Sequence, residues 1–184
     1  MKKQAYVVMA DGSEEMETVI VVDVLRRGGI DVCVAGIGGG RILTSSRGVR
    51  IVPDEAWNSE AAKQADALVI PGGAAGVDVL RMDEGVKQVV GERMFMESWV
   101  ASICAGPLVL HDAGVLKGRR FTSYPSVRNE FSEGTWVDER VVRDGRLITS
   151  QGPGTAFDFA LALLEVLADA GTAAQVAADM LWNR

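Results

Sequence analysis

Short apolar runs alternate with amphipathic segments along most of the chain. The apolar runs are bounded by glycine, aspartate or proline, as is typical of strands buried on both faces, and lie at 5–10, 30–36, 67–70 and 99–103. Apolar positions recur with helical spacing at 14–27, 61–66, 83–97, 108–113, 156–169 and 172–181. This alternation predicts an α/β fold, with a mostly parallel sheet covered by helices on both faces.

Smaller elements interrupt this alternation. The segment 42–52 has the pattern of a small extended excursion or hairpin, 120–123 that of a short strand, and 125–131 that of one or two helical turns. The segment 137–150 predicts a β-hairpin, because Asp144-Gly145 separates two runs rich in β-branched residues. We find no linker and no internal repeat, so we expect one domain over 1–184.

Charge and cysteine content exclude several classes of protein. The formal net charge is -6 with no basic run, which argues against a nucleic-acid-binding surface. No apolar segment is as long as a membrane span, and the run near the N-terminus is too short for a signal peptide. Cys33 and Cys104, the two cysteines, have no metal-ligand spacing. We therefore expect a cytoplasmic protein with reduced cysteines, no metal and no membrane contact.

The stretch 100–110 carries the clearest chemical signal. It reads as the end of a buried strand, a sharp turn at Cys104 and the start of a helix, with Pro107 suited to the first helical turn. Small residues flank the turn, as in the nucleophile elbow of hydrolases. A thiol at a helix N-terminus has a lowered pKa and is reactive. The alternative is a small buried cysteine that only packs, as we expect for Cys33 in its strand.

Three turns far apart in the sequence should meet at one edge of the sheet. They are Asp11-Gly12, Gly72-Gly73 and Cys104, each after a predicted parallel strand. Ligands of such sheets bind beyond the carboxyl ends of the strands. The backbone N–H groups of Gly72, Gly73 and Ala105 could stabilise a developing oxyanion there. The alternative for Gly72-Gly73 is simply a tight turn.

Glu17 is the candidate acid beside the cysteine. It lies on the apolar stripe of the first helix, with Ile20, Val21 and Val24. Burial raises the pKa of a glutamate. A protonated Glu17 could donate a hydrogen bond to a Cys104 thiolate, or carry protons as a general acid and base.

The other charged residues of the first helix have simpler interpretations. Asp11-Gly-Ser-Glu14 has the form of a capping box, and Glu14 and Glu15 complement the helix dipole. Asp23 and Arg27 are four residues apart and can pair. Met16 either packs in the core or meets a partner subunit. His111 lies seven residues after Cys104, about 10 Å along a helix, so we expect it to be structural.

A set of motifs resembles one known superfamily over essentially the whole chain. They are Glu-Glu-Met-Glu-Thr-Val-Ile at 14–20, Asp-Val-Leu-Arg-Arg-Gly-Gly-Ile at 23–30, Val-Ala-Gly at 34–36, Pro-Gly-Gly at 71–73, Ile-Cys-Ala-Gly-Pro at 103–107 and Gly-Pro-Gly-Thr-Ala-Phe-Asp-Phe-Ala-Leu at 152–161. They resemble the ThiJ/PfpI superfamily, most of all its parkinsonism-associated DJ-one branch. The resemblance implies a flavodoxin-like three-layer sandwich, a single domain related to class I glutamine amidotransferases, and a homodimer through the first helix.

The same resemblance implies roles for named residues. Cys104 becomes the reactive cysteine, Glu17 the acid beside it, and Gly73 and Ala105 the backbone donors. The residues at the pocket or the dimer boundary become Arg47, Arg27, Met16, Tyr124 and Pro153. The implied activities need no cofactor: glyoxalase-type conversion of methylglyoxal to lactate, deglycation of early glycation adducts, oxidative-stress sensing and chaperone action.

One position departs from the family pattern. Members with glyoxalase activity often carry histidine before the proline where this chain has Tyr124-Pro125. A tyrosine side chain ordinarily has a pKa of about 10, so it cannot act as a general base at neutral pH. Glu17 is then the main proton carrier, strong glyoxalase turnover is less expected, and Asp23 loses its role as partner of that histidine.

Two functions follow from these residues. In the first, the Cys104 thiolate attacks a small 2-oxoaldehyde, and Glu17 moves a proton between adjacent carbons to give a hydroxy acid. In the second, the protein is a redox-responsive binding protein, in which oxidation of Cys104 to the sulfinate is the signal, stabilised by protonated Glu17.

Overall fold

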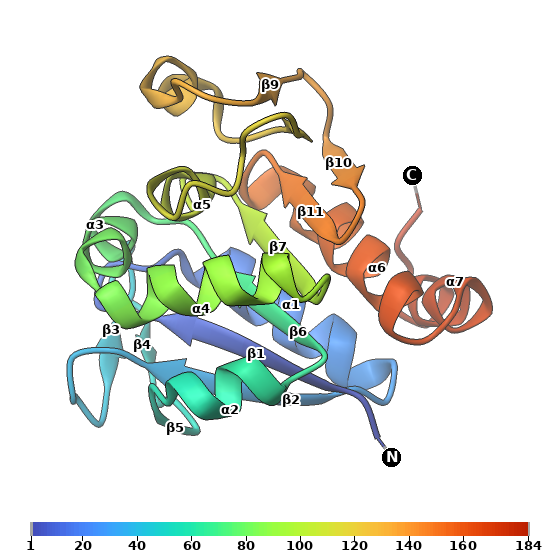
Figure 1. Ribbon diagram of the computed structural model, residues 1–184. Coiled ribbons are helices and arrows are strands. Elements are labelled where there is room, and N and C mark those ends of the chain that lie inside the picture. The colour runs from blue at the N-terminus through green and yellow to red at the C-terminus, as the bar shows by residue number, and fades with distance from the viewer. Residues whose placement is uncertain (1, 184) are drawn as a thin grey trace.

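A computed structural model describes residues 2–183 and has a seven-stranded sheet at its centre (Figure 1). The strand order is β10-β11-β7-β6-β1-β2-β5, and only β10 runs antiparallel to its neighbour. The strands are β1 Gln4–Met9, β2 Asp31–Gly36, β5 Glu55–Ala56, β6 Ala67–Ile70, β7 Trp99–Ile103, β10 Val141–Asp144 and β11 Leu147–Ser150. The predicted flavodoxin-like α/β fold is therefore confirmed.

Helices cover both faces of this sheet and form two apolar cores. The helices are α1 Glu15–Arg27, α2 Ser59–Gln64, α3 Ala74–Met82, α4 Glu84–Phe95, α5 Pro107–Asp112, α6 Ala156–Leu167 and α7 Ala170–Asp179. One face packs against α2, α3, α4 and α5, and the other against α1, α6 and α7. The result is the predicted three-layer sandwich.

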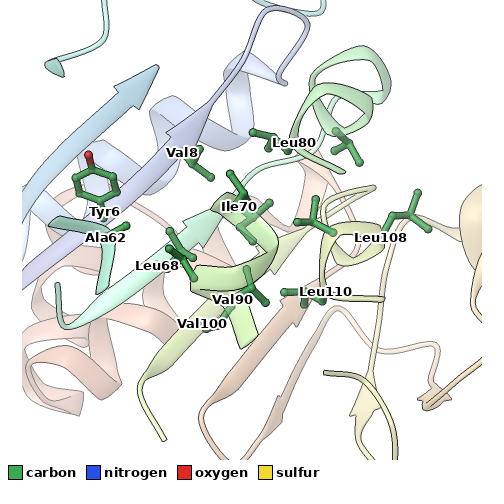
Figure 2. Packing of buried hydrophobic residues seen from close by; sticks show 14 of the residues in the cluster. Tyr6, Val8, Ala62, Leu68, Ile70, Leu80, Val90, Val100, Leu108 and Leu110 are labelled. Carbon is green, nitrogen blue, oxygen red and sulfur yellow. The ribbon is translucent and has the colours of Figure 1, made fainter. Parts of the chain in front are cut away.

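Each central strand supplies both cores, because successive side chains of a strand point to opposite faces. In β6, Leu68 and Ile70 join the core under α2–α5, whereas Ala67 and Val69 join the core under α1 and α6. Figure 2 shows Leu68 and Ile70 beside Leu80 of α3, Val90 of α4 and side chains of α5. Each fully buried aliphatic side chain contributes about 1.5–3 kcal/mol, so the continuous apolar runs stabilise the sheet from both sides.

Helix α3 is the main element that the pattern did not predict. It follows β6 directly, and Gly73, with φ 90°, precedes its first residue. Its apolar contacts come from Val77 and Leu80, spaced three residues apart on the buried face. Gly76 lies inside the helix because an added Cβ would be 2.4–2.7 Å from atoms of Ser13. The glycines that conceal the helical pattern are thus required by close packing.

The smaller predicted elements are present, with modest differences in extent. The segment 42–52 contains an antiparallel pair, β3 Leu43–Thr44 with β4 Arg50–Ile51. The hairpin of β10 and β11 turns at Gly145, with φ 58°. The remaining elements are β8 Arg120–Phe121, the 3-10 helix η1 Pro125–Glu130 and β9 Thr135–Trp136. A short 3-10 turn, Pro153–Thr155, also precedes α6.

The capping box predicted at Asp11–Glu14 is wrong. Glu14 itself caps α1, because its Oε2 accepts a hydrogen bond from Glu17 N at 2.8 Å. Asp11 instead accepts one from Thr44 N at 2.7 Å. The chain from β1 passes over β3 before the helix begins, so Asp11 serves that strand rather than the helix.

A buried arginine joins α2 and α4 to the sheet. The Arg93 guanidinium donates to the carbonyls of Ala62 and Ala65 at the end of α2, at 2.7 Å each, and to Trp99 O in β7 at 2.8 Å. Burial lowers the pKa of Arg93 to about 10. The carbonyls at the end of α2, which have no partner within the helix, are satisfied by this side chain. Among residues 2–183, no helix is long and apolar enough to cross a membrane.

Candidate active site

Cys104 lies at a sharp turn between β7 and α5, as predicted. Its φ of 63° is in the left-handed region, which costs a non-glycine residue on the order of 1–3 kcal/mol. Two hydrogen bonds hold the turn: Cys104 N donates to Ser150 O at 3.0 Å, and Tyr124 N donates to Cys104 O at 2.8 Å. Gly106 must be small, because an added Cβ would lie 2.5 Å from Ser102 Oγ. Neighbouring strands and loops therefore impose the strained conformation on the cysteine.

Glu17 reaches the cysteine from α1 and is fully buried. Its Oε2 accepts a hydrogen bond from Gly72 N at 2.7 Å, and within the described chain Oε1 has no partner at hydrogen-bonding geometry. An added Cβ on Gly72 would lie 2.8 Å from Glu17 Oε2 and 2.9 Å from Cys104 Sγ. A glycine is thus required at 72 so that the carboxyl group and the thiol can share this space.

The two groups influence each other's protonation. Burial raises the pKa of Glu17 to about 7, against the lowering effect of hydrogen bonds from Gly72 N–H and Cys104. Burial also raises the pKa of Cys104 to about 12, with the negative charge of Glu17 and the hydrogen bond between the two groups as further causes. The predicted lowering of the thiol pKa by the helix N-terminus is therefore outweighed by burial and the adjacent carboxylate. Ionisation of either group opposes ionisation of the other.

The N–H groups near the sulfur differ from those expected. Hydrogen bonds from Ala105 N–H and Gly73 N–H lower the pKa of the Cys104 thiol, so both groups are directed at the sulfur. Gly72 N–H is already engaged by Glu17, so the prediction that it faces a developing oxyanion is wrong. Gly73 has φ 90°, and an added Cβ would overlap Gly12 O. Only glycine allows this loop to pass so close to the start of α1.

A cavity of about 340 Å³ opens beside Cys104. It brings together several residues that the sequence singled out, namely Arg47, Gly73, Ala105, Tyr124 and Pro153. Its remaining lining is Glu14, Ser46, Ala74, Ser126 and Val127. Ser126 and Val127 were not foreseen, because their place in the pocket depends on the path of η1, which carries no motif.

Arg27 and Met16 lie outside this cavity. Arg27 is ten residues after Glu17 along α1, a rise of about 15 Å, and its Nε pairs with Asp23 Oδ2 at 2.6 Å. The structure thus does not bring Arg27 to the cysteine. Met16 is on α1 with 54% of its surface exposed. For both residues, a position at a dimer boundary stays a prediction.

Cys33 and His111 have surroundings of their own. Cys33 is only partly buried, rather than the core residue that its strand predicted, and burial followed by the charges of Glu55 and Asp54 raises the pKa of its thiol to about 12. His111 Nε2 lies 2.9 Å from Ser132 Oγ, and its ring makes an edge contact with Phe131. His111 therefore holds the loop after η1, in keeping with a structural role.

A cysteine in a left-handed turn beside a buried carboxyl group, at the carboxyl edge of a flavodoxin-like sheet, defines a class of α/β proteins with an elbow-type cysteine site. The chain belongs to the DJ-1/PfpI family, whose model matches residues 3–166. It is 42% identical to Protein dj-1beta of Drosophila melanogaster over 183 residues, which is 98% of each chain. The crystal structure of Drosophila melanogaster DJ-1beta superposes with a TM-score of 0.95 over 100% of both chains, at 40% identity. A Caenorhabditis elegans relative, Glutathione-independent glyoxalase DJR-1.2, is 36% identical over 159 residues, covering 85% of this chain and 84% of the relative.

Proposed function

We propose that this protein is a cysteine-dependent enzyme that acts on reactive aldehydes or their glycation adducts and protects against oxidative stress. The observation that carries the proposal is the pairing of Cys104 with a buried Glu17 whose pKa is about 7. A general acid and base works best when its pKa is near the operating pH. The glyoxalase relative from Caenorhabditis elegans supports the same class of reaction.

The chemistry needs one proton that the two side chains share. The Cys104 thiolate adds to the aldehyde carbon of methylglyoxal, and Glu17 protonates the new alkoxide to give a hemithioacetal. The Glu17 carboxylate then removes the hydrogen of that carbon as a proton, and an enediolate forms with its negative charge on the former ketone oxygen. Glu17 returns the proton to the adjacent carbon, and the hydroxyl proton of the first carbon passes to the second oxygen. The product is a lactoyl thioester, which water hydrolyses to lactate and the free thiol. Gly73 N–H and Ala105 N–H, which face the sulfur, stabilise negative charge that develops beside it.

The cavity sets the environment of this reaction. Its lining residues come from segments far apart in the sequence, the first at Glu14 and the last at Pro153. Because these segments build one site together, we treat the chain as one domain. No residue of the lining calls for a cofactor in these steps. Because the mechanism requires a reduced thiol, we assign the protein to a reducing compartment such as the cytoplasm.

A second function, redox sensing, is supported by the same donors. If peroxide oxidises Cys104 to the sulfinate, the new oxygens meet Gly73 N–H, Ala105 N–H and a protonated Glu17. Glu17 Oε1 has no hydrogen-bond partner in the described structure, so it is available to such an oxygen. In this alternative, the oxidised cysteine is the signal and turnover is small.

We further infer a homodimer through α1. Two apolar side chains of α1, Met16 and Val19, are 54% and 53% exposed. The adjoining β3–β4 region also exposes apolar side chains, at Ile42, Val49 and Val52. Val19 and Val52 line a shared groove of about 300 Å³, which a second copy of the chain would fill.

The decisive experiment measures lactate formed from methylglyoxal by the purified protein, without glutathione and without Tris. We expect turnover by the native chain and none by Cys104→Ala, with Cys33→Ala as the matched control that retains turnover. Lactate formation that survives Cys104→Ala would reject the enzyme mechanism. A native chain that makes no lactate, but gives a stable Cys104 sulfinate in graded peroxide, would favour redox sensing.

A further inference from the structure

The positive charge that faces the candidate pocket comes from a tight turn between β3 and β4. Among the described residues that line the cavity, Arg47 is the basic one and Glu14, which caps α1, is the acidic one. Its guanidinium makes a long hydrogen bond of 3.3 Å to Ser46 O, and within residues 2–183 it has no carboxylate at ion-pair distance. The positive charge is therefore not neutralised by a neighbour, and its position depends on the turn that carries it.

That turn is built around Glu15. Ser46 Oγ donates to Glu15 Oε2 at 2.9 Å, and Arg47 N donates to Oε1 at 2.9 Å. Glu15 is only 6% exposed although its side chain carries a charge. Burial alone would raise the pKa of Glu15. The carboxylate accepts hydrogen bonds from its own N–H, from the Ser46 hydroxyl and from N–H groups of the hairpin, and these together outweigh burial, so the pKa is lowered overall. A buried carboxylate that accepts hydrogen bonds from a hydroxyl and N–H groups of one short turn fixes the conformation of that turn.

The rest of the turn supports this geometry without using Glu15. Ser46 N donates to Ser13 O at 2.9 Å, Ser45 N donates to Val49 O at 2.8 Å, and Gly48 adopts φ 86°. These bonds tie the backbone to the loop between β1 and α1 and close the hairpin. The backbone N–H of Arg47, however, is held by the carboxylate of Glu15, at 2.9 and 3.2 Å from its two oxygens.

We propose that Glu15 is a positioning residue that holds the 45–48 turn so that Arg47 presents its charge to the pocket, where it selects ligands with a negatively charged group, such as the carboxylate of a 2-oxo or 2-hydroxy acid. This inference rests on the proposed function for its biological meaning, because lactate is such an acid. The charge effect itself needs no turnover. It acts on any small molecule that approaches Cys104.

Alkylation of Cys104 by two matched reagents measures that charge. Iodoacetate and iodoacetamide are nearly the same size, and with both the thiolate forms an S–C bond while iodide leaves. Iodoacetate carries a carboxylate and iodoacetamide is neutral. The ratio of their second-order rate constants, followed at the Cys104 peptide by mass spectrometry, is independent of the fraction of thiolate and of overall accessibility. It reports the electrostatic preference of the pocket.

The Arg47→Gln variant should lower the iodoacetate preference about fivefold, the scale of a unit charge pair about 8 Å apart at an effective dielectric constant of about 40. Glu15→Gln distinguishes the two possible roles of Glu15 by sign. If Glu15 acted only through its own charge, its removal would raise the preference for the anionic reagent. Because it positions Arg47, we expect Glu15→Gln to lower that preference about two- to fivefold.

Further variants serve as controls for this test. Asp11→Asn removes an anion that holds β3 but does not touch the turn, and Arg50→Gln removes a cation of the same hairpin outside the pocket; both should leave the ratio within twofold of native. Glu15→Asp keeps the charge but shortens the reach, so it should also lower the ratio, and it serves if Glu15→Gln fails to fold. In an Arg47→Gln background, Glu15→Gln should produce no further fall.

The proposal is overturned if Glu15→Gln raises the ratio or leaves it unchanged, or if Arg47→Gln has no effect on it. Neither result depends on lactate formation. If the native protein makes no lactate but Arg47→Gln and Glu15→Gln lower the iodoacetate preference as expected, the proposed enzyme is rejected and the positioning role is kept. If the native protein makes lactate but Glu15→Gln leaves that preference unchanged, the proposed enzyme is kept and the positioning role is rejected.

Discussion

Substitution of Glu17 by glutamine separates the reactivity of Cys104 from catalysis, because the structure predicts opposite effects on the two. The amide keeps the shape of the side chain, and its oxygen can still accept from Gly72 N–H. It removes the negative charge that raises the pKa of the Cys104 thiol, and it removes the transferable proton. Alkylation of the thiol should therefore become faster, while turnover should fall.

The expected size of both effects follows from the contact between the two groups. A unit charge about 4 Å away contributes up to about 4 kcal/mol at an effective dielectric constant of about 20, which corresponds to up to about three pKa units. A fall of one to three units raises the thiolate fraction at pH 7 about 10- to 1000-fold. Because nucleophilicity falls as pKa falls, the alkylation rate should rise about 3- to 30-fold. Turnover of methylglyoxal should drop about 100-fold, the usual scale for the loss of a general acid and base.

The assay compares both rates in the same preparation. Iodoacetamide alkylation is followed at the Cys104 peptide, and lactate is measured without glutathione or Tris. Glu165→Gln, an exposed glutamate on α6, is the matched control and should leave both rates unchanged. If Glu17→Gln retains full turnover, Glu17 is not the proton carrier. If its alkylation slows, the carboxylate does not oppose ionisation of the thiol.

Four further results are expected. Arg93→Met leaves the buried carbonyls at the end of α2 without donors and should cost about 3–5 kcal/mol of unfolding free energy in urea, and a loss below about 1 kcal/mol would show that those carbonyls find other partners. Iodoacetamide at neutral pH should modify Cys104 before Cys33, because Cys104 lines the cavity and two N–H groups stabilise its thiolate, whereas the charges of Glu55 and Asp54 oppose ionisation of Cys33; a peptide map with the reverse order would contradict the site assignment. Sedimentation at micromolar concentration should show a dimer that Val19→Asp dissociates, whereas a native monomer would reject the α1 interface. Folding raises the pKa of Glu17 from about 4.5 to about 7, so the stability that this group contributes is complete below about pH 4.5 and declines up to about pH 7. Over that interval the unfolding free energy of the native chain should fall by on the order of 3 kcal/mol relative to Glu17→Gln. Parallel pH profiles of urea unfolding for the two proteins would refute this prediction.

The sheet and the cysteine turn could be predicted because their causes are local. Continuous apolar runs mark strands buried on both faces, and small residues around Cys104 mark a turn in which two segments approach closely. Helix α3 was missed because Gly73 and Gly76, required by contact with the loop that precedes α1, hide its apolar spacing. The pattern of a segment cannot reveal which residues must be small for the sake of another segment.

The site shows the same division. Glu17 could be found from its place on an apolar stripe, because an acid there must be buried. The roles of Gly72 and Glu15 could not, since they depend on which acceptor lies next to a given N–H group in the folded chain. The direction of the Cys104 pKa was likewise beyond the sequence, because burial and a neighbouring carboxylate oppose the helix N-terminus and only their distances decide the outcome.

The most direct test of the account is the titration of the Glu17 carboxyl group, since the proposed chemistry requires that it hold a proton near neutral pH. Carboxyl-carbon NMR of protein labelled with ¹³C-glutamate would follow it, with the signal assigned by its absence from Glu17→Gln. We predict a midpoint near pH 7, well above that of exposed glutamates, as burial beside Cys104 dictates. A midpoint near pH 4 would mean that Glu17 is ionised throughout the neutral range, and it would contradict the assignment of Glu17 as the proton carrier.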